Sequence, residues 1–234
     1  MSTRQPSRGS RVSVSMKGAL ITAAAFAGGV AALVAMVVPG VDAAKPTPAT
    51  LSISANPAAV KVGGSVTLSG KLTGSNVAGR NVRVEQDPFP LGGFDNAGSA
   101  TTNATGDWSL VVKPTANTRY RAGAGKADSP TLDVTVRPSV TLKLSDRTPR
   151  RGRKVRFSGK VCPEHDTVAI ALQRRTKSGW RTVASPVLAD VPGATCSSFA
   201  RRLRVRRTGA YRARFPGDAD HAAGNSRVRR ARVH

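Results

Sequence analysis

The feature that most constrains the fold is an internal duplication with a period of about 90 residues. The tetrapeptide at 69–72 (SGKL) is matched at 158–161 (SGKV), and the tripeptide at 120–122 (YRA) recurs at 211–213. Solenoid repeats have periods of about 20–50 residues, so this longer period indicates two copies of one whole domain.

Apolar and polar residues alternate with a period of two in both copies. The alternation is clear at 66–68 and 82–84 in the first copy and at 155–157 and 203–205 in the second. Such alternation predicts half-buried strands, and turn signals separate them every 8–15 residues or so. No helical periodicity follows Ala44. About seven short strands per copy with this spacing predict an all-β fold of two tandem antiparallel β-sandwiches.

The two copies predict one domain at 50–137 and a second at 138–234. Composition alone would favour disorder, because the net charge is +24 and only 4% of the residues are aromatic. Alternation that keeps its register through two copies is the stronger indication, and it predicts folded domains with cores rich in valine and alanine.

The amino-terminal segment has the three parts of a secretory signal peptide. Residues 1–18 hold four positive charges and no acid, residues 19–38 are an unbroken apolar or small run expected to be helical, and Ala43 offers a small residue for cleavage. The alternative is an uncleaved anchor, since 20 residues can span a bilayer. Either way the protein is expected to be exported, secreted or held at the membrane by 19–38 alone. Residues 44–49 read as a short extended spacer.

The strand motifs resemble those of bacterial immunoglobulin-like repeat domains. The pattern Gly-x-x-Val-x-Leu/Phe-Ser-Gly-Lys stands at 63–71 and 152–160, an aromatic strand follows a turn at 106–110, and each copy closes on a Ser…Val-x-Val or similar strand. The resemblance implies extracytoplasmic modules of the kind found in surface, adhesive or wall-associated proteins. The Cys…Trp…Cys pin of antibody domains is absent here.

The only two cysteines, Cys162 and Cys196, both lie in the second copy. The immunoglobulin-like order would place them on neighbouring strands of one sheet, and an oxidising compartment favours a disulfide between them. The alternatives are a reactive thiol or a metal pair that includes His165, but one cysteine and one nearby histidine do not make a site.

The sequence offers few candidates for catalytic residues, because it has only 13 acidic residues and three histidines. Asp218 and Asp220, followed by His221, could form a weak cation site, but calcium normally takes 6–8 oxygen ligands, and a hydrophilic hairpin is the preferred interpretation. Trp108 and Trp180 occupy positions matched by phenylalanine in the other copy, which favours core packing over sugar stacking. We therefore expect no enzyme activity, catalytic residue, metal or cofactor.

The formal net charge of +24 is concentrated in the second copy. Residues 45–137 carry 10 basic and 6 acidic groups, whereas residues 138–234 carry 23 basic and 6 acidic groups. Strand alternation places many of these bases on the outer faces of both sheets, as candidate contacts for a polyanion. Those on one sheet are Lys154, Arg156, Arg202, Arg204 and Arg206; those on the other are Arg212, Arg214, Arg230 and Arg232.

Two functions follow from this pattern. The first is a structural, adhesive or spacer role at the bacterial cell surface, with the basic charge incidental and a surface protein as one candidate partner. The second is binding of an anionic cell-wall or extracellular polymer through the second domain. Specific nucleic-acid binding is not expected, because the outward positions lack interleaved aromatic residues and no recognition helix is present.

Overall fold

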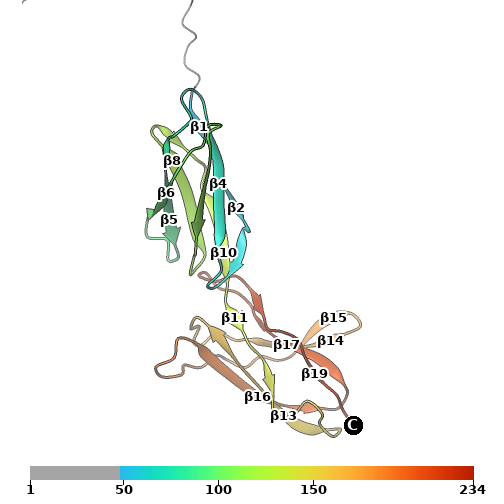
Figure 1. Ribbon diagram of the computed structural model, residues 1–234. Coiled ribbons are helices and arrows are strands. Elements are labelled where there is room, and N and C mark those ends of the chain that lie inside the picture. The colour runs from blue at the N-terminus through green and yellow to red at the C-terminus, as the bar shows by residue number, and fades with distance from the viewer. Residues whose placement is uncertain (1–47) are drawn as a thin grey trace, which may run out of the picture. The chain divides into compact units, whose positions relative to one another are not determined.

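A computed structural model describes residues 48–234, which form an all-β structure of four sheets without a helix (Figure 1). The all-β prediction is confirmed. The predicted signal peptide at 1–43, with its apolar segment 19–38, and the first part of the predicted spacer lie outside the described residues. Within residues 48–234 no helix has the length and hydropathy needed to cross a membrane. All of these residues belong to one compact unit, Lys45–His234.

Two of the sheets are formed by the residues before Pro138. The first contains β1 (Thr50–Leu51), β2 (Ser54–Asn56), β4 (Val66–Thr73) and β7 (Asp107–Val112), with β4 at its centre. The second contains β3 (Ala59–Lys61), β5 (Asn81–Pro88), β6 (Asp95–Thr101), β8 (Thr118–Ala124), β9 (Ala127–Asp128) and β10 (Leu132–Arg137), in the order β3-β10-β8-β5-β6 with β9 on β8.

The other two sheets are formed by the residues from Ser139 onward. The third contains β11 (Ser139–Val140), β12 (Lys143–Leu144), β13 (Arg153–Cys162) and β16 (Ser197–Val205), with β13 at its centre. The fourth contains β14 (Ala171–Thr176), β15 (Gly179–Ala184), β17 (Gly209–Phe215), β18 (Gly224–Asn225) and β19 (Arg229–Ala231), with β14 and β17 paired in its middle.

One strand pair departs from the predicted antiparallel pattern, because β3 runs parallel to β10. The chain leaves the first sheet after β2 at Asn56 and enters the second sheet at Ala59. Pro57 lies at this crossing and has no N–H group to continue the β2 ladder, so the strand ends there.

Two separate hydrophobic clusters form the cores, one for each pair of sheets. One draws on both sheets of residues 51–134 and the other on both sheets of residues 140–231. Each is therefore consistent with a β-sandwich. Trp108 is only 4% exposed and belongs to the first cluster, as predicted. The prediction for Trp180 is wrong: this ring is half-buried outside the second cluster, stacked against arginines on the outer side of its sheet.

Close packing accounts for the glycine of the repeated Ser-Gly-Lys motif. A Cβ atom on Gly159 would overlap the carbonyl oxygen of Thr141 and the ring of Phe199. A Cβ atom on Gly70 would meet the same kind of neighbours, the carbonyl oxygen of Ser52 and the indole of Trp108. At both positions a central strand is covered by an aromatic ring from the next strand, and only glycine leaves room for it.

Candidate functional site

The pairing of β13 with β16 places four basic residues directly opposite one another in two pairs. Lys154 faces Arg204 and Arg156 faces Arg202, and all four side chains are exposed. These four residues are called the basic ladder. Residues opposite each other on one face of an antiparallel pair have Cβ atoms about 4.5–5.5 Å apart, so each pair brings two like charges together on the outer surface of the third sheet.

Within residues 48–234 no acidic side chain forms an ion pair with the basic ladder. Every ion pair that a lysine or arginine makes within residues 48–234 belongs to the first two sheets. Five of the six acids after Pro138 instead gather in two groups, one of Glu164, Asp166 and Asp190 and the other of Asp218 and Asp220. The charges of residues 138–234 are thus segregated, and the arginines there have no acidic partner.

A hollow of about 440 Å³ adjoins the basic ladder at Arg204. Its walls include Arg174, Arg206 and Arg207, together with Tyr211 and two aliphatic side chains. This set of four arginines is called the arginine hollow. Arg174 donates to the carbonyl oxygen of Thr208 at 3.3 Å, while its buried Nε has no partner.

The chemistry of the arginine hollow suits an anionic group with several oxygens. Guanidinium groups present planar forks of N–H donors that match phosphate, sulfate and carboxylate groups. Burial raises the pKa of the Tyr211 phenol, partly offset by the charge of Arg174, so at neutral pH the phenol adds a neutral hydroxyl to this cationic wall.

The predicted contacts on the fourth sheet divide into two kinds. Arg230 and Arg232 are exposed, on and just after β19. Arg212 is half-buried: its guanidinium stacks over Trp180 with 4.4 Å to the ring centre, and its Nε donates to Gln173 at 2.8 Å. Burial lowers the pKa of Arg212, with further lowering by the charges of Arg214 and Arg175. Arg212 is therefore engaged within the sheet itself, and Arg214 beside it is also half-buried.

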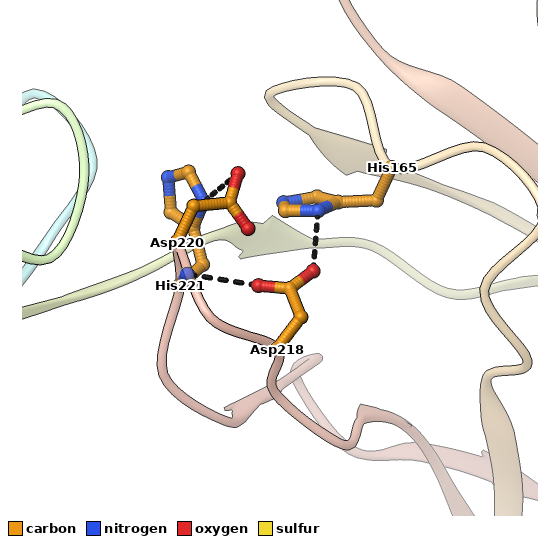
Figure 2. Close-up of side chains that lie close together, drawn as sticks. All are labelled: His165, Asp218, Asp220 and His221. Atoms are coloured by element: carbon orange, nitrogen blue, oxygen red, sulfur yellow. Dashed lines mark hydrogen bonds and ion pairs between the residues drawn. The ribbon is translucent and has the colours of Figure 1, made fainter. Parts of the chain in front are cut away.

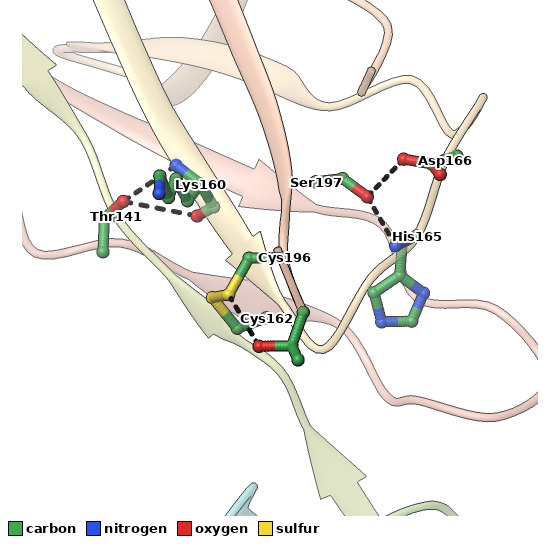
Figure 3. Close-up of a disulfide and its surroundings, with 8 residues drawn as sticks. Thr141, Lys160, Cys162, His165, Asp166, Cys196 and Ser197 are labelled. Carbon is green, nitrogen blue, oxygen red and sulfur yellow. Dashed lines mark hydrogen bonds between the residues drawn. A yellow bond between two sulfur atoms is a disulfide. The ribbon is translucent and has the colours of Figure 1, made fainter. Parts of the chain in front are cut away.

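The two cysteines form the predicted disulfide between the end of β13 and the residue before β16 (Figure 3). The reactive-thiol and metal-pair alternatives are thereby excluded for Cys162 and Cys196. Next to the bridge the hydroxyl of Ser197 accepts from the backbone N–H of His165 at 2.7 Å and donates to Asp166 at 2.6 Å. These bonds anchor the loop that follows β13.

Two carboxyl groups of that loop, Glu164 and Asp166, lie close to Asp190 from the segment between β15 and β16. The hydrogen bond with Asp166 raises the pKa of Glu164 to about 7, and the negative charges of Asp166 and Asp190 add to the effect. This group therefore carries less negative charge near neutral pH than its three acids imply, which leaves the arginines still less compensated.

Sequence reasoning missed a second cluster, in which His165 meets the loop between β17 and β18. Figure 2 shows His165, Asp218, Asp220 and His221 converging, and their donor atoms lie within 4.8 Å of one another. The hydrophilic hairpin expected for 218–221 is wrong in one respect, because His221 is only 3% exposed. The Asp-x-Asp-His pattern was visible in the sequence, but its partner His165 lies about 50 residues earlier.

The two aspartates of this cluster influence each other. Burial raises the pKa of Asp218, and its hydrogen bond with Asp220 raises it further. Burial also opposes ionisation of Asp220, but the hydrogen bond from Asp218, a backbone hydrogen bond and the nearby histidines together outweigh burial and lower the pKa of Asp220.

The chain matches no protein-family model, and no curated protein matches it. Its function has to be argued from the basic surface and the clusters themselves.

Proposed function

We propose that this is an exported, non-enzymatic protein of two immunoglobulin-like β-sandwiches, and that residues 138–234 bind an anionic polymer outside the cell. The observation that carries the proposal is the basic ladder: two like-charged pairs held face to face in register, with no ion pair to relieve them. Such pairs destabilise a sheet, so a protein that keeps them gains when a polyanion supplies the missing negative charge.

Matched positions in the two predicted copies strengthen this argument. In the first, Lys71 pairs with Asp107 across the sheet at 3.5 Å; the position that matches Lys71 is Lys160, and it faces Ser198. One of the two pairs of the basic ladder, Arg156 with Arg202, is matched in the first copy by two neutral residues that face each other, Thr67 and Val111.

The same difference recurs on the other sheet of each copy. Arg121 forms an ion pair with Glu85 at 2.6 Å and lies over the Phe94 ring. Its matched residue Arg212 also lies over an aromatic ring, but its hydrogen-bond partner is the neutral Gln173. At these matched positions both copies have a base, but only the first copy has an acid that pairs with it. This difference favours a local requirement for positive charge in the second copy over a uniform bias of composition.

Residues 50–137 fit a spacer or structural role better than polymer binding. Four of their nine lysines and arginines form ion pairs with acids, including Arg119 with the buried Asp87 and Arg83 with Glu85, whereas no lysine or arginine in 138–234 does. The surface-adhesive or spacer function therefore stands as the second proposal, now confined to this half of the chain.

Retention of the protein on heparin, on polyphosphate and on isolated cell wall as a function of salt tests the proposal. Arg202→Ala combined with Arg204→Ala removes two charges of the basic ladder and one wall of the arginine hollow. Each lost phosphate contact should reduce the slope of log affinity against log salt by about one. The matched control, Arg230→Ala with Arg232→Ala, removes the same charge at exposed positions of the other sheet, where the sequence also predicts contacts, and so separates the basic ladder from the rest of the basic surface.

The proposal predicts that the ladder variant loses most of its retention at ~0.15 M salt and the control keeps it. Equal loss in both variants, or complete elution of the unmodified protein below ~0.15 M salt, would show diffuse charge attraction only and leave the structural role as the function.

A further inference from the structure

We infer that His165, Asp218, Asp220 and His221 form a binding site for one divalent transition-metal ion, with Zn²⁺ the ion best suited to this donor set. The site is separate from the basic surface and does not depend on the proposed polymer binding. Two loops build it: one follows β13 and carries His165, and the other joins β17 to β18 and carries the remaining three residues.

Both histidines are buried, and each has a ring nitrogen with no hydrogen-bond partner. His165 is 6% exposed and His221 is 3% exposed. The atoms without a partner are Nε2 of His165 and Nδ1 of His221. Buried polar atoms are rarely left without a partner in folded proteins, so two of them in one cluster point to a ligand that both atoms would contact.

The tautomer of His221 indicates the kind of ligand that this cluster would bind. Its Nε2 lies 2.9 Å from the carbonyl oxygen of Thr115, which can only accept, so Nε2 carries the proton. In the neutral ring Nδ1 then presents a lone pair, and it lies 3.3 Å from Oδ2 of Asp220 without hydrogen-bond geometry. A lone pair facing a carboxylate oxygen is repulsive unless a proton or a metal ion lies between them, and the geometry for a shared proton is absent here.

The hydrogen bond of His221 to Thr115 is also the outer contact that metal-binding histidines usually make. Such a bond from the second ring nitrogen to a backbone carbonyl fixes the ring and its tautomer for coordination. Asp218 is oriented in a similar way, because its Oδ1 accepts from the backbone N–H of His221 at 2.8 Å while its Oδ2 lies 2.8 Å from Nδ1 of His165. The cluster is thus positioned by its own two loops and by the carbonyl group of Thr115 before any ion arrives.

The distances fit a small four-coordinate ion. Zn–N and Zn–O bonds of about 2.0–2.2 Å place tetrahedral ligands about 3.4 Å apart. The donor atoms here lie within 4.8 Å, so the farthest pair has to close by little more than 1 Å. Two imidazoles exclude Ca²⁺ and Mg²⁺, which take oxygen ligands, and two carboxylates balance the charge of a divalent ion.

Zinc titration of the protein, with any purification tag removed and a chromophoric chelator as competitor, tests the inference. We expect one Zn²⁺ per chain and a rise in the thermal midpoint that a chelator reverses. Asp218→Asn and His221→Gln should each weaken zinc affinity at least about tenfold. His234→Gln removes the exposed terminal histidine and Asp190→Asn removes an acid of the neighbouring cluster, so both controls should bind zinc like the unmodified protein.

A second measurement needs no variant and is independent of any folding defect. Co²⁺ bound to the unmodified protein at one equivalent should show the intense visible absorption of a tetrahedral site, displaced by one equivalent of Zn²⁺. No saturable binding, a weak octahedral cobalt spectrum, or equal loss of zinc in His234→Gln and His221→Gln would overturn the inference.

Discussion

Charge reversal at Arg202 should stabilise the fold while it weakens polymer binding. Arg202 faces Arg156 directly across β13 and β16, and Lys154 lies diagonal to it on the same face. In the Arg202→Glu variant the repulsive pair becomes an attractive one. This opposition of stability and binding is what the proposed function requires of the basic ladder.

The size of the effect can be worked out from the pairing. Two unit charges about 6 Å apart in a water-like dielectric interact by ~0.7 kcal/mol, so a change of sign is worth at most about 1.4 kcal/mol. Measured cross-strand charge pairs contribute about 0.2–1 kcal/mol each. We expect the free energy of unfolding to rise by about 1 kcal/mol at low salt. That exceeds the change of about 0.5 kcal/mol typical of surface substitutions.

Urea denaturation followed by tryptophan fluorescence measures this change in the right half of the chain. Trp108 belongs to the core of the first two sheets and Trp180 lies on the fourth sheet, so a Trp108→Phe background leaves a probe in residues 138–234 alone. The matched control is Arg227→Glu, which alters the net charge equally at an exposed position between β18 and β19.

The salt dependence decides whether the gain is electrostatic. At ~1 M salt the screening length falls to about 3 Å, and the advantage of Arg202→Glu should vanish. The reasoning is refuted if Arg202→Glu is no more stable than Arg227→Glu at low salt, or if its gain persists at ~1 M salt.

Three further predictions concern the fold itself. Replacing Cys162 and Cys196 by serine opens a link across 34 residues and should lower the free energy of unfolding of residues 138–234 by about 4 kcal/mol in urea, so an unchanged midpoint would contradict it. Gly159→Ala forces a Cβ into a backbone carbonyl and an aromatic ring and should cost about 1–3 kcal/mol in the same assay. The hydrogen bond from Arg119 lowers the pKa of Asp87, so this group adds stability that is present above about pH 3.9 and is lost as the pH falls through its lowered folded value. Thermal midpoints between pH 5 and pH 2 should therefore drop more in the unmodified protein than in Asp87→Asn.

The longer strands could be predicted because their burial alternates. The predicted alternation at 66–68, 82–84, 155–157 and 203–205 falls within β4, β5, β13 and β16. The two-residue strands β1, β9, β11, β12 and β18 are too short for any period to show. Residues 168–172 also alternate apolar and small side chains, but they form a ladder only from Ala171, since Ala169 makes an isolated bridge to Val187.

The orientation of a side chain could be predicted only where it depends on the residue's own strand alone. Alternation alone places Arg202 and Arg204 outward, and both are exposed. It also places Arg212 outward, but it says nothing of the Trp180 ring that the neighbouring hairpin lays beneath it. The position of His165 depends on topology alone, because it meets Asp218 only after the two sheets of residues 138–234 have packed on each other.

The segregation of charge in residues 138–234 links the two proposals through one physical cause. An acid placed among the arginines would relieve their repulsion, yet Asp218 and Asp220 lie in a histidine-lined cluster between two loops, and Glu164 shares its hydrogen bond with Asp166. Acids held in this way cannot neutralise the sheet faces, so the basic ladder keeps its full charge, as the proposed polymer binding requires. The unrelieved repulsion within the basic ladder lowers the stability of the third sheet in the unbound protein. A cation bound by His165, Asp218, Asp220 and His221 would raise the stability of the fold without adding negative charge to the basic surface.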